Sequence, residues 1–336
     1  MYKNKDWIKK VISNQETNKV PYNFDFSPPV RQFVEEHYGG SPIEEVLNFP
    51  IRMNAPNSIK PLYAEPSVYG KKIVDEFGVV WSTSSIDRGS PIGPCLPKPD
   101  LSDYKFPNAN ASYRFENLRD WCLENQKNFT IIWIGDLWER ATFMRGMENL
   151  LIDLVLNSSF VNRILYKITE YILETIKILH EKFRFDGIAL SDDYGSQKSM
   201  LMSPKDWRKF IKPCLKKIYS LAKKYKKYTF HHSCGNIYPI IGDLIDIGLD
   251  ILHPIQPEVM DIFKLKRNFG KYITFCGGIS TQYLLPRGTV KEIKDEIKKL
   301  KNEMAKRGGY ILEPGITVQA DIPHKNLIAM IDEIIK

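Results

Sequence analysis

The 336-residue sequence has little of what marks secreted or membrane proteins. It contains no run of about 18 apolar residues, so it predicts no membrane-spanning helix. The N-terminal stretch MYKNKDWIKKVISNQE lacks the apolar centre of a signal peptide. The five cysteines are odd in number and widely scattered, which argues against a disulfide framework and fits a reducing compartment. These absences predict a cytoplasmic protein without a membrane partner.

The sequence also lacks the marks of a nucleic-acid-binding protein. Its net charge is +8, but the basic residues are dispersed and form no stripe interleaved with aromatic residues. We therefore predict no nucleic-acid partner and interpret the charge as a lysine-rich, solvated surface. The alternative is a docking face for an acidic protein partner.

What the chain does contain is an alternation of β-rich and helical segments. With 43% apolar residues it can bury a large core. The β-rich runs are FTIIWIGD, FDGIALSDD, YTFHHSCG, DILHPIQ, YITFCGG and GYILEPG. The helical stretches between them are 142–157, 159–183, 204–225, 237–247, 258–268, 289–307 and 323–335. This alternation predicts a parallel sheet covered by helices.

Two earlier runs, VPYNFDF and FPIRMNA, could raise the number of strands to eight, which predicts an α/β fold of the (β/α)8 TIM-barrel type. No G-x-G-x-x-G turn follows the first strand, which argues against an open doubly wound sheet. Residues 60–115 do not follow the alternation. They include a predicted hairpin in YGKKIVDEFGVVWSTSS and a stretch rich in Pro and Gly. We predict a single domain over 1–336, with 60–115 as an excursion beside the barrel mouth.

One stretch, KKYTFHHSCGNIYPII, carries an unusual concentration of possible metal ligands. In an extended chain, residues two apart face the same side, so His232 and Cys234 can meet one ion while His231 faces away. Imidazole and thiolate together suit zinc. The alternative is a packed cysteine beside a hydrogen-bonded histidine. Cys276 ends another predicted strand, and we expect it to be the third ligand.

The segment SDDYGSQ ends a further strand and supplies two acidic side chains. Asp192 and Asp193 are adjacent, so only one of them can point directly into the barrel mouth. A carboxylate there could orient a substrate or move a proton, and both residues are candidate catalytic groups. The alternative for the pair is a helix cap or a hydrogen bond within a loop.

Three segments together resemble the uroporphyrinogen decarboxylase superfamily. They are HHSCGNIYPIIGDLIDIGLDILHPIQP, FCGGISTQYLLPRGT and GGYILEPGITVQADIPHKNLIAMIDEI. The superfamily contains the decarboxylase of haem synthesis and the cobalamin-dependent methyltransferases of the methylcobamide:coenzyme M type. The resemblance covers roughly residues 128–336. It implies a (β/α)8 barrel whose site lies at the carboxyl ends of the strands.

The resemblance is closer to the methyltransferase branch. The decarboxylase signature R-Q-A-G-R, whose arginines hold the carboxylates of a porphyrinogen, is absent, and PPVRQFVEEHYGG contains only Arg31. The methyltransferases have an H-x-C zinc motif, which His232 and Cys234 match. Their third ligand is a cysteine that follows Pro-Gly, where this chain has Ile316. Cys276 or, failing that, Glu313 could replace it.

The resemblance implies a zinc-dependent methyltransferase that moves a methyl group between a small thiol or methyl-ether substrate and a corrinoid carried by a partner protein. A first alternative is a metal-independent decarboxylase of a small carboxylated substrate, in which Asp192 would stabilise a cationic intermediate and His232 would donate a proton. A second is a non-enzymatic corrinoid- or tetrapyrrole-binding protein. We expect the substrate-binding walls to include Tyr194, Gln256, Trp138 and Trp81.

Overall fold

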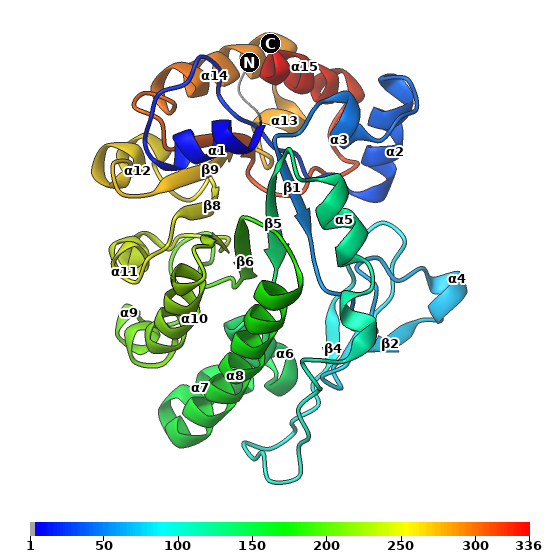
Figure 1. Cartoon of the computed structure of the whole chain (residues 1–336), viewed down its shortest axis with the longest axis vertical. Coiled ribbons are helices and arrows are strands. Elements are labelled where there is room, and N and C mark those ends of the chain that lie inside the picture. Colours follow the sequence, from blue (N-terminus) through cyan, green and yellow to red (C-terminus); the bar gives the residue numbers. More distant parts are fainter. Residues whose placement is uncertain (1–3) are drawn as a thin grey trace.

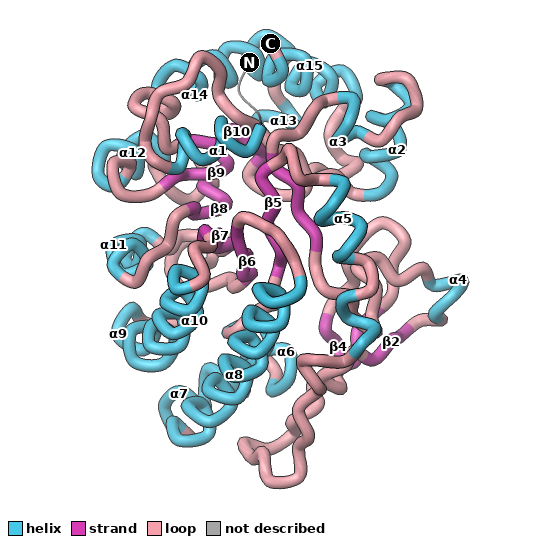
Figure 2. Tube along the Cα trace, in the orientation of Figure 1, coloured by secondary structure: helices cyan, strands magenta, loops and turns pink. Residues whose placement is uncertain are grey.

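The computed structural model describes residues 4–336 and is built around a curled, parallel, seven-stranded sheet (Figure 1). Helices lie on the outside of the curl, and the strands line its inside (Figure 2). In spatial order the strands are β1 (Ile51–Asn54), β5 (Phe129–Trp133), β6 (Gly187–Ser191), β7 (Tyr228–His232), β8 (Ile251–Ile255), β9 (Thr274–Ile279) and β10 (Tyr310–Pro314). Because all neighbours are parallel, every strand ends at the same rim.

Most helices connect one strand to the next, as the alternation predicts. The α-helices are α1 (Asn4–Ile12), α2 (Pro28–His37), α3 (Ile43–Val46), α4 (Pro66–Tyr69), α5 (Leu118–Glu124), α6 (Trp138–Arg145), α7 (Met147–Leu156), α8 (Ser158–Lys182), α9 (Pro204–Asp206), α10 (Lys212–Lys224), α11 (Ile241–Asp246), α12 (Ile262–Phe269), α13 (Leu284–Arg287), α14 (Val290–Glu303) and α15 (His324–Ile335). Short 3-10 segments are η1 (Ser112–Phe115) and η3 (Tyr238–Ile240), and η2 (Trp207–Ile211) is a π-helical turn. Among the described helices, none combines the length and the apolar character needed to cross a bilayer.

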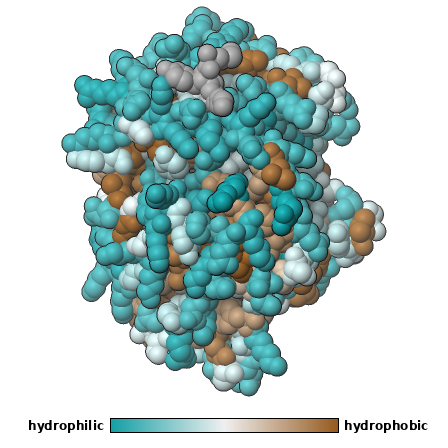
Figure 3. Space-filling view, viewed as in Figure 1, coloured by the Kyte–Doolittle hydropathy of each residue, from teal (hydrophilic) through white to brown (hydrophobic). Residues whose placement is uncertain are grey.

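Local sequence signals explain where several helices begin. Thr289 and Glu292 form a reciprocal capping box at the start of α14, and Asp261 caps α12. Ser203 accepts a hydrogen bond from the backbone of Asp206 at the start of α9. Hydrophilic residues cover most of the surface that is visible in Figure 3.

The two faces of the sheet bury two separate apolar groups. The outer face packs against the helices and contributes most of the core. The inner face buries a smaller group, formed by Ile51, Phe129, Ile131, Ala189, Phe230, Ile251, Cys276 and Ile311. Ile8 and Val11 of α1 join this inner group, so α1 covers the end of the curl where the strands begin. The opposite end, where the strands finish, is therefore the mouth.

The predicted run FPIRMNA contains β1, but the run VPYNFDF does not form an eighth strand among residues 4–336. It lies beside β10 and makes two isolated parallel bridges, Tyr22 to Leu312 and Phe26 to Val318. The ladder is interrupted because the chain after β10 leaves the strand direction at Pro314 and returns only at Val318. The fold is therefore TIM-barrel-like, with seven regular strands and an irregular segment in place of the eighth.

Residues 60–115 carry a second, separate sheet. Strands β2 (Lys72–Val74), β3 (Val80–Ser82) and β4 (Pro91–Gly93) pair antiparallel in the order β2-β3-β4. Figure 1 shows β2 and β4 toward the same end of the molecule as α6 and α7. An ion pair of 3.0 Å between Arg88 and Asp25 ties this segment to the chain that runs beside β10. The excursion thus contributes side chains to the mouth.

Candidate functional site

On the inner face of the sheet, the side chains change from apolar to polar over the last two residues that face inward before the mouth. Side chains two residues apart on a strand share a face, so His232 lies directly above Phe230, His253 above Ile251, and Glu313 above Ile311. The pairing register places His232 opposite His253 on neighbouring strands. A layer of titratable groups therefore lies on the apolar floor of the curl.

Three potential metal ligands converge at the mouth, and we call Asp193, His232 and Cys234 the mouth trio. Their ligand atoms all lie within 4.8 Å of one another. His232 Nε2 is 3.4 Å from the Cys234 sulfur and 3.5 Å from a carboxylate oxygen of Asp193. The backbone amide of Cys234 donates a 2.7 Å hydrogen bond to the same Asp193 oxygen. One imidazole nitrogen, one sulfur and one carboxylate thus face a common point.

Two glycines allow the loops that carry the mouth trio to touch. Gly235 follows Cys234 with a φ of +82°, and a Cβ there would collide with the backbone of Gly195. A Cβ on Gly195 would lie 2.6 Å from the backbone nitrogen of Asn236. Asn236 N also donates a 2.9 Å hydrogen bond to Ser196 O. This backbone-to-backbone contact holds Asp193 beside Cys234.

The two adjacent aspartates have different environments. Asp192 is fully buried and accepts hydrogen bonds from the backbone nitrogens of Leu137 and Glu139 at 2.9 and 3.0 Å. Its other oxygen accepts the hydroxyl of Tyr194 at 3.0 Å. Burial raises the pKa of Asp192 to about 8. Asp192 therefore supports the start of α6 from beneath, and the structure places Asp193 at the mouth.

A second group of ligand atoms lies deeper, and we call His253, Cys276 and Glu313 the inner trio. Their atoms also lie within 4.8 Å of one another. The Cys276 thiol donates to a Glu313 oxygen at 2.8 Å, and His253 Nε2 is 3.7 Å from that oxygen. Asn23 donates to the other Glu313 oxygen at 3.0 Å. The expected third zinc ligand, Cys276, is thus grouped with Glu313 and not with Cys234.

The two trios meet through their histidines. His232 Nδ1 and His253 Nδ1 are 2.9 Å apart, which is hydrogen-bonding distance. Burial lowers the pKa of both imidazoles, and for His253 the neighbouring His232 lowers it further. His231 faces away from this pair, as expected, and its Nδ1 is 2.7 Å from the Tyr219 hydroxyl. Both mouth-facing histidines are therefore held neutral.

Burial also raises the pKa of Glu313 to about 7, while its hydrogen bonds with Cys276 and Asn23 oppose the shift. For the two thiols, burial raises the pKa of Cys234 and of Cys276, and in each case a neighbouring carboxylate adds to the effect. Without a cation, these sulfurs are protonated at neutral pH. A metal ion that binds them must displace those protons.

A protonated carboxyl group borders the mouth. Glu139, at the start of α6, accepts the Ser191 hydroxyl at 3.0 Å. Burial, followed by the charges of Asp193, Asp136 and Asp192, raises the pKa of Glu139 to about 9. Glu139 is therefore neutral at physiological pH and can donate a proton, which is the property required of a general acid.

The four expected substrate-binding residues lie in different places. Trp138 and Tyr194 are fully buried in the outer core, and their side chains do not reach the mouth. Gln256 is also buried, and its carbonyl oxygen accepts the Gly235 backbone amide at 2.7 Å, so it supports the loop after β7. Trp81 is half-buried on β3, and its indole nitrogen donates to Asp75 at 2.9 Å. Of the four, only Trp81 has a partly exposed ring.

Sequence reasoning did not identify two other residues near the trios. Asn23 contacts Glu313 from the irregular segment beside β10. Arg88 lies on the excursion, and its charge lowers the pKa of His232, His253 and Cys234. Arg88 lies outside the strand–helix alternation, and Asn23 lies in the run VPYNFDF, whose place beside β10 is set by a segment almost 300 residues later. Their contacts with the site are long-range, so the local sequence pattern did not reveal them.

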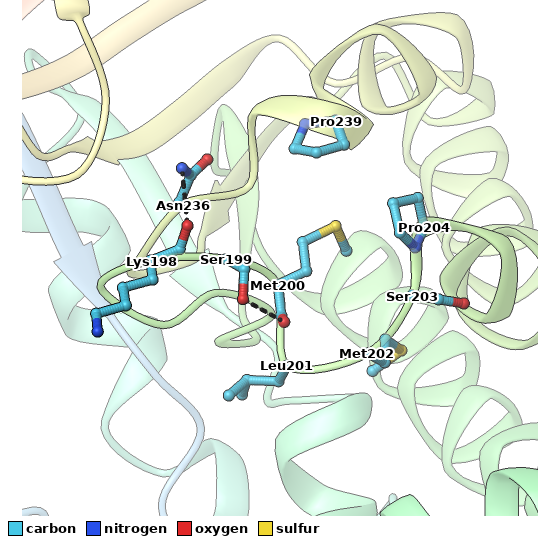
Figure 4. Close-up of a pocket in the computed structure, with 9 residues that line it drawn as sticks. All are labelled: Lys198, Ser199, Met200, Leu201, Met202, Ser203, Pro204, Asn236 and Pro239. Atoms are coloured by element: carbon cyan, nitrogen blue, oxygen red, sulfur yellow. Dashed lines mark hydrogen bonds between the residues drawn. The ribbon is translucent and has the colours of Figure 1, made fainter.

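A separate hollow of about 440 Å³ lies beside the site, on the same two loops. Figure 4 shows Met200 directed between Pro204 and Pro239, while Asn236 donates to the carbonyl of Lys198. The lining residues are Lys198, Ser199, Met200, Leu201, Met202, Ser203, Pro204, Asn236 and Pro239. None of the six trio residues lines this hollow.

Comparison with known proteins places the chain in a family. The family model described as uroporphyrinogen decarboxylase (URO-D) matches residues 130–336. A methyltransferase from Methanosarcina mazei has a similar solved structure, with a TM-score of 0.74 and 19% identity over 99% of this chain and 98% of that chain. A xylanase from Gloeophyllum trabeum gives a TM-score of 0.42 and 10% identity over 72% of this chain and 84% of that chain. No curated protein matches by sequence.

At these identities the solved structures show the shared fold and nothing about chemistry. The family match begins at residue 130 and includes all six residues of the two trios. It also includes strands β6 to β10 and all of β5 except its first residue. It confirms the resemblance predicted from the three sequence segments. The chain belongs to the uroporphyrinogen decarboxylase family.

Proposed function

We propose that this protein is a zinc-dependent methyltransferase that transfers a methyl group between a small thiol or methyl-ether substrate and the corrinoid of a partner protein. The observation that supports it most directly is the convergence of Asp193, His232 and Cys234 at the barrel mouth. The structural likeness to a methyltransferase over nearly the whole chain is compatible with it.

The spacing of the mouth trio suits a tetrahedral ion. Zinc bonds of about 2.0–2.3 Å at tetrahedral angles put neighbouring ligand atoms roughly 3.3–3.6 Å apart. The nitrogen–sulfur and nitrogen–oxygen distances at His232 are 3.4 and 3.5 Å. Nitrogen, sulfur and carboxylate oxygen are all zinc ligands, and three protein ligands leave one position for a substrate. Asp193 thus takes the place that we expected Cys276 to fill.

Each residue of the site then has a defined task. Zinc held by the trio would act as a Lewis acid toward a thiol sulfur or an ether oxygen. Glu139, which is neutral at physiological pH, can give its proton to an alkoxide leaving group. Arg88 keeps positive charge near the mouth, where substrate charge would develop. The decarboxylase alternative is weaker, because Asp192 is buried beneath α6 and does not reach the mouth.

Zinc analysis of purified protein tests the proposal. After incubation with zinc and removal of excess, we expect one ion per wild-type chain. Asp193→Asn, His232→Ala and Cys234→Ala should each lose most of the bound zinc, whereas Cys214→Ala, on α10 and away from the mouth, should retain it. A wild-type protein that binds no zinc would exclude this mechanism.

An activity assay follows from the same proposal. Methylcobalamin and a panel of small thiols should give methyl transfer that zinc-loaded protein accelerates and a chelator abolishes. The loss of methyl from the corrinoid can be followed by its absorbance. Chelator-resistant release of carbon dioxide from a small carboxylic acid would instead support the decarboxylase alternative.

A further inference from the structure

The inner trio has the composition of a metal site, but its contact with His232 indicates a different task. We propose that His253 and Glu313 are positioning residues that form a relay. His253 hydrogen-bonds the His232 ring and presents its Nε2 to the ion in the mouth, and Glu313 faces the other ring nitrogen of His253 at 3.7 Å. Neither residue binds a second ion. This inference rests on the proposed zinc site and specifies how the fold supports it.

The two facing imidazoles of His232 and His253 share one proton between their Nδ1 atoms, and this fixes which nitrogen of each ring is free. A hydrogen bond of 2.9 Å between His232 Nδ1 and His253 Nδ1 needs one proton between the two nitrogens. A neutral imidazole carries one N–H, and only an imidazole with an unprotonated nitrogen has a lone pair for an ion. When an ion takes the lone pair of His232 Nε2, the proton of His232 must be on Nδ1. His253 Nδ1 then accepts it, and the proton of His253 must be on Nε2.

The mouth trio and the inner trio cannot both bind an ion while both imidazoles stay neutral. With its proton on Nε2, His253 has no lone pair left for an ion in the inner trio. A neutral His253 could bind an inner ion only if its proton moved to Nδ1, and His232 would then carry its own proton on Nε2 and leave the mouth ion. Simultaneous occupation would require an imidazolate. The two trios are therefore alternatives.

The surroundings of His253 match the relay. Its Nε2 lies 3.7 Å from a Glu313 oxygen, which is longer than a hydrogen bond, so the N–H that His253 must carry on Nε2 lies next to a carboxyl group. Asn23 and the Cys276 thiol fix that carboxyl group with bonds of 3.0 and 2.8 Å. The chain of contacts runs from the ion position through two rings to a buried, hydrogen-bonded carboxyl group.

Substitutions of His253 test whether its side chain accepts the proton of His232 or only fills space beside it. His253→Ala removes the acceptor for His232 Nδ1, and loss of such an outer partner typically lowers metal affinity about 10–100-fold. In His253→Asn, the amide oxygen can occupy the place of Nδ1 and accept the same proton, so affinity should recover. In His253→Gln, the amide group lies near the place of Nε2 and should not rescue. Equal losses in Asn and Gln variants would overturn the relay.

Cys276→Ser separates positioning from ligation. Serine keeps a donor for Glu313 but lacks the thiolate, so the relay predicts wild-type zinc affinity and one ion per chain. Loss of zinc in Cys276→Ser would show that Cys276 is a ligand, as the sequence first suggested, and would overturn the proposal. Two ions per wild-type chain, with the second lost in this variant, would overturn it as well.

Nitrogen-15 NMR of labelled histidines tests the relay even without zinc. In metal-free wild-type protein, one Nδ1 of the facing pair should be protonated and the other should be an acceptor. In zinc-loaded protein, His253 should carry its proton on Nε2. If both Nδ1 atoms are protonated, or neither is, the relay fails. If wild type binds no zinc but shows the shared proton, the proposed function fails while the histidine pairing stands.

Discussion

At the scale of single residues, neighbouring side chains in this site differ more in environment than in type. Asp192 and Asp193 are adjacent and chemically alike, yet one is fully buried under α6 and the other faces the mouth. Strand alternation predicted that only one of them could enter the mouth. It could not say which, because the choice depends on the backbone amides of Leu137 and Glu139, which come from another strand–helix loop.

Glu139 gives a prediction about pH. Its ordinary pKa is 4.5, and burial with nearby negative charge raises it to about 9 in the folded protein. As pH rises, the unfolded chain therefore loses this proton before the folded protein does. The contribution of Glu139 to the stability of the fold is complete below pH 4.5 and declines as pH rises toward 9. Glu139→Gln imitates the protonated form and does not ionise. We expect its stability relative to wild type to increase across this window.

Urea unfolding of the metal-free proteins at a series of pH values measures this difference. Glu181→Gln, an exposed position near the end of α8, is the matched control and should run parallel to wild type. If the Glu139→Gln curve is also parallel to wild type from pH 5 to 9, the carboxyl group is not held neutral by the fold, and its role as a general acid loses its basis.

At the scale of elements, the sequence predicted the strands better than the loops between them. The six β-rich runs each contain one strand of the main sheet, because continuous apolar, β-branched runs suit strands buried on both faces. The run VPYNFDF alternates apolar residues with Pro, Asn and Asp, which also suits a strand, but Pro314 and Gly315 turn its partner away after a few residues. Its outcome depends on a segment almost 300 residues later in the chain.

Gly235 gives a prediction about the two loops that carry the mouth trio. Its φ of +82° and the contact with Gly195 leave no room for a side chain. Gly235→Ala should lower the free energy of unfolding by at least about 1–3 kcal/mol through backbone strain alone, and more through the collision. Because Cys234 is adjacent, zinc affinity should fall as well. Chemical denaturation and zinc titration measure the two effects.

Gly242→Ala is the matched control for this substitution. Gly242 lies in α11, and nothing is within 4 Å of the place of its Cβ. Alanine there should stabilise the helix by about 0.5–1 kcal/mol and leave zinc affinity unchanged. If Gly235→Ala were equally harmless, the two loops would not need their close backbone contact, and the alignment of Asp193 with Cys234 would require another explanation.

At the scale of the whole molecule, the parallel order of strands is what assembles the site. His232, His253, Cys276 and Glu313 are spread over 82 positions of the sequence, yet four neighbouring strands present them on one inner face. This convergence follows from the barrel-like topology and was predictable from the alternation of segments. The division into two trios was not, because it depends on the depth of each residue along its strand.

The first helix gives the last prediction. The α1 helix covers the end of the curl where the strands begin, opposite to the mouth, and its Ile8 is fully buried against the inner apolar group. Ile8→Ala leaves a cavity in a floor that strands from across the whole sheet share, so it should cost about 2–5 kcal/mol of unfolding free energy. Ile152→Ala, on an exposed face of α7, should change the free energy of unfolding by less than about 0.5 kcal/mol.

Urea denaturation compares the stability of the two variants. Zinc titration of the folded Ile8→Ala protein should give wild-type affinity, because the apolar floor lies between Ile8 and the mouth trio. A loss of zinc affinity without a loss of stability would mean that α1 is coupled to the mouth and does not simply close the other end of the barrel.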